Sequence, residues 1–353
     1  MTPRGTILIT GLNGYLAGRV AEAVLKAGYR VRGTVRRLTT GLRVQEALIE
    51  LGYNRDLVEV IQVSDITQPS AFDEAALGCT AIIHTATPTD VSGMTDAAEV
   101  VRSAVSSTVA VLHSAEKAGP QLQSVVYMSS SAAIFNTPPE AKVHTERDWN
   151  TTSEALVDRL GSEAGALVSY AASKTAAEKA FWKFRDERKP GFALAAVQAS
   201  WFIGPPMVPW ETRDQIPYCL SLVWKVVAGE DIPDPLPVYD ATIDVRDVAR
   251  VLVWAALHPK EADGERYLCS AASGGAQAIA DILSKHMPGL QVKRGNPGIG
   301  YKPDYSDPEG VTAFGCSKVV KATGQGWIPY ETSVLDTAGV LQQYLHSAVS
   351  ETR

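Results

Sequence analysis

Tyr170 and Lys174 stand one helical turn apart in the segment YAASK. On an α-helix, residues at i and i+4 lie on the same face. An ammonium group beside a phenol favours the phenolate and brings its pKa down from about 10 toward neutrality, which makes the tyrosine a usable general acid. The spacing therefore indicates a proton donor, Tyr170, with Lys174 as its electrostatic partner.

A second group of polar side chains follows the apolar run SVVY, where Ser129, Ser130 and Ser131 occur in succession. Hydroxyls at the end of a buried strand can form an ordinary turn or can orient a reacting oxygen. Because side chains alternate along a strand, Ser129 and Ser130 must face opposite sides. The residues alone leave open which serine, if any, is catalytic.

A glycine-rich segment, TGLNGYLAG at residues 10–18, connects the strand-like run TILIT to a helical pattern. Glycines such as Gly11 and Gly14 permit a tight turn and close approach of the backbone to a pyrophosphate. The phosphates then lie at the helix N-terminus, where free N–H groups and the macrodipole favour anions. We expect this turn to bind a dinucleotide, and a purely structural strand-to-helix turn is the alternative.

The residues around the second predicted strand indicate which dinucleotide. A free ribose 2′-hydroxyl is held by an acidic residue at this position, whereas a 2′-phosphate is held by cations. From residue 23 to residue 45 there is no Asp or Glu, while arginines occur at Arg32, Arg36, Arg37 and Arg43. This pattern favours NADP(H), with Arg36 as the first phosphate ligand and Arg37 as the second. Solvated surface arginines are the alternative.

Short apolar runs alternate with helical patterns over the first two hundred residues, at 6–10, 29–35, 57–63, 81–86, 124–130 and 192–198. Such alternation predicts an α/β fold with a doubly wound parallel sheet. After Gly204 the sequence becomes rich in proline and aromatic residues, which predicts a smaller C-terminal substrate lobe. We expect a nucleotide-binding domain over 1–200, a lobe over 201–353, and a return of 240–260 to the first domain.

Composition excludes several classes of protein. The chain has 353 residues, 45% of them hydrophobic, and a formal net charge of -6. It has no sustained basic patch for nucleic acid and no apolar run near the roughly 18 residues that span a bilayer. The four cysteines and six histidines are scattered, which predicts reduced thiols and no metal site. Because MTPRG leads directly into a strand, we expect no secretion signal and a cytoplasmic monomer or homodimer that binds a small molecule.

The chain resembles the extended short-chain dehydrogenase/reductases, and within them the group of dihydroflavonol reductases, cinnamoyl-CoA reductases and fungal carbonyl reductases. The motifs that carry the resemblance follow the order of the group: TGLNGYLAG, RVRGTVR, IIHTATP, MSSSAAIF, TERDWN, YAASK, FIGPP, DVRDVAR and RYLCS. It implies a Rossmann domain, NADPH, and reduction of an aldehyde or ketone. It also implies that Tyr170 protonates the carbonyl oxygen, Lys174 holds the nicotinamide ribose, and Ser130 is the catalytic serine, with Ser131 as second choice.

The resemblance implies further contacts with the cofactor, at Gly11, Asn13, Gly14, Tyr15, Leu16, Arg36, Arg37, Asp65, Ile66, Thr85, Ala86, Tyr170, Lys174, Ala199 and Trp201. Asp65 has two open interpretations, since it could flank the adenine or cap a helix. His84 is expected to be a residue at a strand end, with a role in proton transfer as the alternative. We expect the substrate pocket at Ser131, Ile134, Phe135, Trp201, Phe202 and Trp210. The many aromatic residues and few cations around this pocket favour an apolar or aromatic carbonyl compound as the substrate.

Two positions depart from the pattern of the group. Ala110 stands where many extended members have asparagine, and Gln198-Ala199 stands where Asn-Pro is frequent. These departures leave room for a non-redox isomerase or cyclase, or for a cofactor-holding sensor, on the same scaffold. A sugar-nucleotide epimerase or dehydratase is the remaining alternative. The arginines argue against an epimerase, because epimerases usually keep NAD as their cofactor. The chain also lacks the acidic pair that dehydratases carry after the serine.

Overall fold

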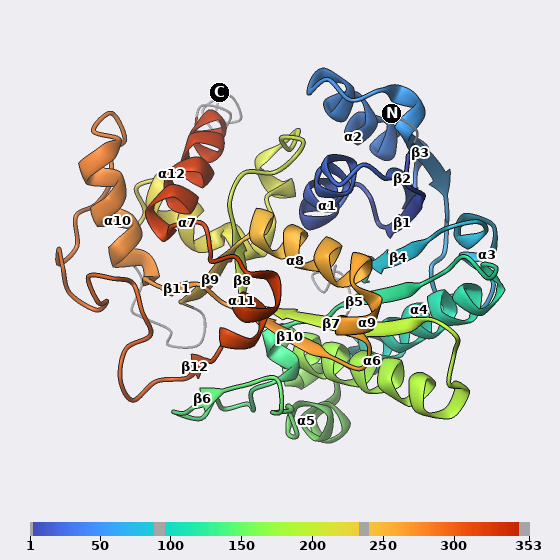
Figure 1. Ribbon diagram of the computed structural model, residues 1–353. Helices are drawn as coiled ribbons and strands as arrows, with labels where there is room; N and C mark the ends of the chain where they lie inside the picture. Colours follow the sequence, from blue (N-terminus) through green and yellow to red (C-terminus); the bar gives the residue numbers. More distant parts are fainter. Residues whose placement is uncertain (1–2, 88–95, 233–239, 346–353) are drawn as a thin grey trace.

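The computed structural model describes residues 3–87, 96–232 and 240–345. Its centre is a seven-stranded sheet in the order β10-β7-β5-β4-β1-β2-β3, in which every neighbouring pair is parallel (Figure 1). The strands are β1 (Thr6–Thr10), β2 (Arg30–Val35), β3 (Val58–Gln62), β4 (Ala81–His84), β5 (Ser124–Met128), β7 (Ala193–Ala199) and β10 (Arg266–Cys269). The predicted doubly wound parallel sheet is confirmed.

Helices cover both faces of this sheet. One face is covered by α1 (Tyr15–Lys26), α2 (Leu38–Glu50) and α8 (Val245–Leu257), and the other by α3 (Asp73–Ala76), α4 (Ala97–Lys117) and α6 (Ala166–Arg188). Alternate residues of a strand serve the two layers: Ile7 and Ile9 join the core cluster under α1 and α8, while Leu8 joins the cluster under α4 and α6. Burial on both faces explains why the strands read as continuous apolar runs.

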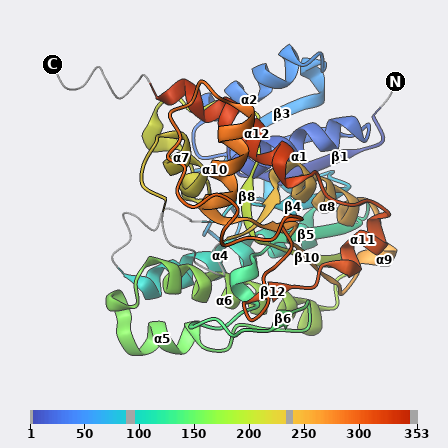
Figure 2. The same ribbon diagram turned by 90° about the vertical axis from the view of Figure 1, so that its left-hand side faces the viewer.

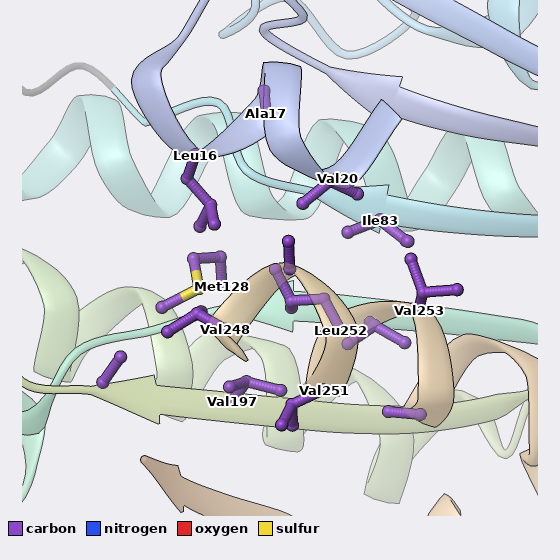
Figure 3. Close-up of a cluster of buried hydrophobic side chains, with 14 of the residues drawn as sticks. Leu16, Ala17, Val20, Ile83, Met128, Val197, Val248, Val251, Leu252 and Val253 are labelled. Atoms are coloured by element: carbon purple, nitrogen blue, oxygen red, sulfur yellow. The ribbon is translucent and has the colours of Figure 1, made fainter. Parts of the chain in front are cut away.

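The chain after residue 200 returns to this domain twice. Helix α8 packs on α1 and on β4, β5 and β7, and Figure 3 shows Val248 and Leu252 of α8 facing the side of α1 that carries Leu16 and Val20. The strand β10 then pairs in parallel with β7, from Arg266 opposite Ala196 onward. Residues 266–269, which the sequence assigned to the C-terminal lobe, therefore form an edge strand of the main sheet.

The C-terminal lobe has its own small sheet and its own core. Three strands, β8 (Trp201–Ile203), β9 (Ala241–Asp244) and β11 (Ala272–Ser273), lie in the order β11-β9-β8. A separate hydrophobic cluster joins the helices α7 (Ser221–Val227), α10 (Gly275–His286) and α12 (Tyr330–Leu341). Figure 2 turns this lobe toward the viewer.

The remaining elements are short or peripheral. The strands β6 (Val143–His144) and β12 (Ala313–Phe314) pair in parallel, and α5 (Ser153–Leu160) packs on α6. The other helices are α9 (Pro259–Ala262), α11 (Ser317–Thr323) and the 3₁₀ turns η1 (Arg55–Leu57), η2 (Ser131–Ala133), η3 (Gly161–Ala164), η4 (Arg213–Gln215), η5 (Tyr218–Leu220) and η6 (Gln342–Tyr344). Within the described ranges, no helix has the length and apolar character needed to cross a membrane.

The topology collects the candidate residues at one edge of the sheet. The strand order reverses between β1 and β4, since β2 and β3 lie on one side and β5, β7 and β10 on the other. Ligands of open α/β sheets bind at such a switch point, outside the carboxyl ends of the strands. The glycine-rich turn, residues 85–87 and the serine triplet all follow these carboxyl ends.

Candidate active site

A cavity of about 890 Å³ opens at the carboxyl ends of β1, β2, β3 and β4. Its walls bring together many of the residues predicted to contact the cofactor, namely Gly11, Asn13, Gly14, Arg36, Arg37, Asp65, Ile66, Thr85 and Ala86. Residues 34–37 and 63–67 form one side of it, and the glycine-rich turn faces residues 85–87. The volume falls in the range of cavities that hold cofactors and other small ligands.

The glycine-rich turn has the backbone geometry that a pyrophosphate requires. Gly11 has a φ of +72°, and a Cβ atom there would come within 3.2 Å of the Ala86 Cβ. The Gly14 N–H donates to the Gly11 carbonyl at 2.8 Å, which closes the turn just before α1 begins. The N-terminus of α1 therefore points its free amides and positive dipole end into a space that a side chain would fill. The residues present fit a dinucleotide phosphate.

The arginines of this region divide into two kinds. Arg32 donates to Glu59 at 2.6 Å and to two backbone carbonyls, and Arg43 pairs with Glu211 at 2.5 Å. Arg36 and Arg37 are exposed at the wall of the cavity, and within the described residues neither guanidinium forms an ion pair. These two guanidinium groups are available to a 2′-phosphate.

Asp65 uses its side chain to hold the turn after β3. One carboxylate oxygen accepts from the Thr67 amide and hydroxyl at 2.9 and 2.6 Å, and the other accepts from Gln68 at 2.7 Å. These bonds, with that from the Thr67 hydroxyl first, keep the pKa of Asp65 below its ordinary value. The next helix, α3, begins only at Asp73, so the interpretation of Asp65 as a helix cap is replaced by a turn cap at the cavity wall.

His84 supports the opposite wall of the cavity. Its Nδ1 lies 2.8 Å from the Thr10 hydroxyl, whose oxygen accepts from the amides of Thr85 and Ala86 at 3.1 and 3.0 Å. Since that oxygen already accepts twice, its proton points to His84. Burial lowers the pKa of His84 to about 3, with a further contribution from Lys174. His84 is thus a neutral structural acceptor, which argues against a role in proton transfer.

Ser130, Tyr170 and Lys174 converge beside this cavity. Ser130 follows β5 in an extended conformation, and its oxygen accepts from the Ala132 amide at 3.2 Å. The Ser130 hydroxyl lies close enough to the Tyr170 hydroxyl to lower the pKa of that phenol. The Lys174 amine, 4% exposed, donates to the Thr87 hydroxyl at 3.0 Å and to the carbonyl that ends β5 at 3.1 Å. Because Thr87 lines the cavity, Lys174 joins the tyrosine to the predicted cofactor site.

The pKa shifts of Tyr170 and Lys174 differ from those expected from the sequence. Burial raises the pKa of Tyr170, and the nearby Ser130 hydroxyl offsets only part of this rise. Burial lowers the pKa of Lys174 to about 8. The prediction that Lys174 lowers the pKa of Tyr170 is therefore wrong for this structure, because the amine is directed at Thr87 and a backbone carbonyl. At neutral pH the phenol keeps its proton, as a proton donor must.

The other two serines have different surroundings. The Ser129 hydroxyl, 2% exposed, donates to the Glu178 carboxylate, two helical turns after Tyr170 on α6. Ser131 begins the short turn η2 and is buried beside Ser130. Ser130 is thus the serine whose hydroxyl acts on the pKa of Tyr170.

Aromatic residues of the C-terminal lobe approach this site. Trp201 and Phe202 are half-buried on β8, and the Trp201 ring lies 5.7 Å from that of Tyr218. Cys219, adjacent to Tyr218, is near enough to Tyr170 to contribute to the rise in its pKa. Sequence reasoning missed Cys219, and only the folding of η5 over the site brings it there. Trp210 packs against Tyr15 with ring centroids 5.8 Å apart.

Several predicted site residues have their side chains elsewhere. Ile134 and Phe135 are 1% and 8% exposed and belong to the hydrophobic core, where Phe135 packs against Phe314. This burial argues against a pocket-lining role. Leu16 is in the same core, Ala199 is buried at the end of β7, and the Tyr15 hydroxyl donates to the Gly204 carbonyl at 2.5 Å. The sequence alone does not distinguish an apolar residue that faces the core after a strand from one that faces a pocket.

Comparisons with known proteins agree with this geometry. A model of the NAD dependent epimerase/dehydratase family matches residues 7–270. An oxidoreductase of Schizosaccharomyces pombe is 34% identical over 80% of this chain and 82% of its own. Ketoreductase adrE of Penicillium roqueforti is 32% identical over 94% of this chain and 95% of its own. The crystal structure of yeast methylglyoxal/isovaleraldehyde reductase Gre2 with NADPH superposes with a TM-score of 0.83, at 26% identity, and covers 96% of this chain and 98% of Gre2.

These findings confirm the resemblance found in the motifs, because the similarity covers both the sheet and the C-terminal lobe. The chain belongs to the NAD dependent epimerase/dehydratase family, in the extended short-chain dehydrogenase/reductases, with fungal carbonyl reductases among its relatives.

Proposed function

We propose that this chain reduces an apolar or aromatic aldehyde or ketone, with Tyr170 as the proton donor. The chain is an NADP(H)-dependent oxidoreductase, as are the NADPH-dependent reductases among its relatives. The observation that carries the proposal is the Lys174 amine that reaches Thr87 at the cofactor cavity, together with a Ser130 hydroxyl close enough to Tyr170 to lower the pKa of that phenol. Reduction of a carbonyl needs a proton donor placed beside such a cavity.

Individual residues have separate roles in the proposed reduction. When bound, NADPH supplies the hydride that reduces the carbonyl carbon. Arg36 and Arg37 hold the 2′-phosphate at the cavity wall. Ser130 holds the substrate oxygen and the Tyr170 hydroxyl, and Tyr170 transfers its proton to that oxygen as negative charge develops.

The preference for an apolar substrate rests on the C-terminal lobe. The rings of Trp201 and Tyr218 form an aromatic surface, and Cys219, beside Tyr218, is near enough to Tyr170 to raise its pKa. The guanidinium of Arg213, a cation of this lobe, lies 4.8 Å from the centre of the Trp224 ring. A pocket lined mainly by aromatic side chains selects ligands by apolar area and shape.

A panel of carbonyl compounds tests the proposal. Purified protein is incubated with NADPH and aromatic aldehydes, β-keto esters or diketones, and the loss of reduced nicotinamide absorbance is followed. We expect reduction of several aromatic or apolar members and little reduction of phosphorylated or sugar-derived carbonyls. Tight binding of NADPH without reduction of any carbonyl would reject the function and favour a non-redox activity on this scaffold.

Replacing Arg36 with alanine should lower the affinity for NADPH far more than the affinity for NADH. Loss of one charge-assisted hydrogen bond to the 2′-phosphate costs about 2 kcal/mol, or roughly 30-fold in the dissociation constant. Fluorescence titration of both nucleotides measures the two constants. Arg43→Ala is the matched control, because that guanidinium already pairs with Glu211 and should leave both affinities unchanged. An equal loss for NADPH and NADH in Arg36→Ala would refute the assignment.

We also infer a cytoplasmic location and a monomeric or homodimeric state. All four cysteines are free, as expected for a reducing compartment. Light scattering after size-exclusion chromatography measures the oligomeric state directly, and a larger assembly would contradict this inference.

A further inference from the structure

Glu178 is a buried acid directly behind the catalytic residues. It lies one helical turn after Lys174 and two turns after Tyr170, so all three project from one stripe of α6. Its side chain is 0% exposed. It accepts hydrogen bonds from Ser129, from Gln198 at 2.6 Å, from Arg266 at 2.7 Å and from Trp182 at 3.2 Å. Since Arg and Trp side chains can only donate, this set of partners fits an ionised carboxylate.

Arg266 holds this carboxylate from the far side. It is 8% exposed, and its Nη1 donates to the backbone carbonyls of Glu146 and Asp148, both at 2.7 Å. Its guanidinium also lies 3.9 Å from the centre of the Trp149 ring. The ion pair therefore links β10 and the 146–149 segment to the catalytic helix. A buried ion pair is by itself weak evidence for stability, because the cost of removing the two charges from water offsets their attraction.

The Lys174 amine has few charged neighbours. On its own helix it faces Tyr170 and Glu178, on β4 it faces His84, and on β5 its amine lies 5.6 Å from the centre of the Tyr127 ring. The histidine and both phenols are neutral at neutral pH, because burial lowers the pKa of His84 and raises those of the tyrosines. Within the described residues, Glu178 is thus the one anion that acts on the amine, and it opposes the loss of charge that burial favours.

We propose that the buried Glu178–Arg266 pair supports the reaction through Lys174. Glu178 keeps the Lys174 amine in its charged form, and Arg266 limits the strength of this effect by offsetting the charge of Glu178. The proposal rests on the proposed function for its catalytic meaning, since a charged amine is what serves a proton donor and a cofactor ribose. Glu178 and Arg266 are positioning residues, because they act through Lys174 and touch neither reacting atom.

Three substitutions separate charge from shape. Glu178→Gln keeps the side-chain shape and removes the anion, so the charged amine loses its stabilising partner. Glu178→Asp keeps the anion with altered packing. Arg266→Gln keeps a hydrogen-bond donor and removes the cation that offsets Glu178, so the amine should be held more strongly in its charged form.

The readout is the titration of Lys174 itself in cofactor-free protein. Lysine side chains are labelled with ¹³C, spectra are recorded against pH, and Lys174→Arg identifies the signal. In the unsubstituted protein this signal should titrate near pH 8, well apart from ordinary lysines, whose pKa is about 10.4. We expect the midpoint to fall by about one pH unit in Glu178→Gln, to rise in Arg266→Gln and to stay near 8 in Glu178→Asp.

The kinetics should follow the titration. Reduction needs a charged Lys174 and a protonated Tyr170, so the alkaline limb of kcat should move to lower pH in Glu178→Gln and not in Glu178→Asp. A purely structural role would lower the melting temperature of both variants and leave the titration unmoved, and that result overturns the proposal. If Glu178→Gln does not fold, an unmoved midpoint in Arg266→Gln overturns it equally. Absence of carbonyl reduction by the unsubstituted protein would instead reject the proposed function, while the titration still decides this proposal.

Discussion

Replacing Tyr170 with phenylalanine is expected to lower kcat for carbonyl reduction by about 10²–10⁴-fold, the contribution of a positioned proton donor. The substitution removes one hydroxyl, which lies near that of Ser130, and keeps the ring. The walls of the cofactor cavity come from other residues, so the affinity for NADPH should change by less than about threefold. Steady-state kinetics and fluorescence titration of NADPH measure the two quantities separately.

Tyr218→Phe is the control for this substitution. Tyr218 is another tyrosine at the same site, 69% exposed, with its ring beside Trp201. Loss of its hydroxyl should change KM more than kcat, because it contributes surface to the pocket and no proton to the reaction. Activity retained by Tyr170→Phe, or an equal loss in both variants, would remove Tyr170 from its role as donor.

The features that local sequence could predict are those formed by neighbours along the chain. The glycine-rich turn, the arginines after β2 and the pair Tyr170 and Lys174 are each set by spacing within one element or one connection. Parallel strands of alternating βα units have their carboxyl ends at one edge, so their placement together also follows from the pattern. This is why the sheet and the cofactor cavity agree with the sequence-based expectations.

The features that the sequence could not predict depend on contacts between distant segments. Arg32 and Arg36 look equivalent in sequence, but Glu59 on the neighbouring strand engages only the first. Nothing in the local pattern at Glu178 indicates that Arg266, on the edge strand, will pair with it. Likewise the direction of the pKa shift at Tyr170 depends on burial and on where the Lys174 amine points, and spacing on a helix fixes neither.

Ser130→Ala should lower kcat by about 100-fold or more, the usual consequence of removing one donor that stabilises a developing oxyanion. The Ser130 hydroxyl also lowers the pKa of Tyr170, against the larger effect of burial, so its removal should raise that pKa further. A phenol with a higher pKa keeps its proton to higher pH, but Lys174, with a pKa of about 8, loses its proton first, so the alkaline limb of kcat should stay where it is. A lower kcat with an unmoved alkaline limb therefore separates loss of the Ser130 hydroxyl from a disturbance of Lys174.

Ser129→Ala tests the neighbouring serine at the same strand end. Its hydroxyl donates to Glu178, which keeps donors from Trp182, Gln198 and Arg266, while the Ser129 amide still donates to the Val197 carbonyl at 2.8 Å. The loss of one buried hydrogen bond costs about 1–3 kcal/mol of stability, seen as a lower melting temperature. Because the backbone and the charge of Glu178 persist, kcat and its alkaline limb should stay close to those of the unsubstituted protein. If Ser129→Ala lowered kcat as much as Ser130→Ala, the two hydroxyls could not be given different roles, and the assignment of Ser130 as the catalytic serine would fail.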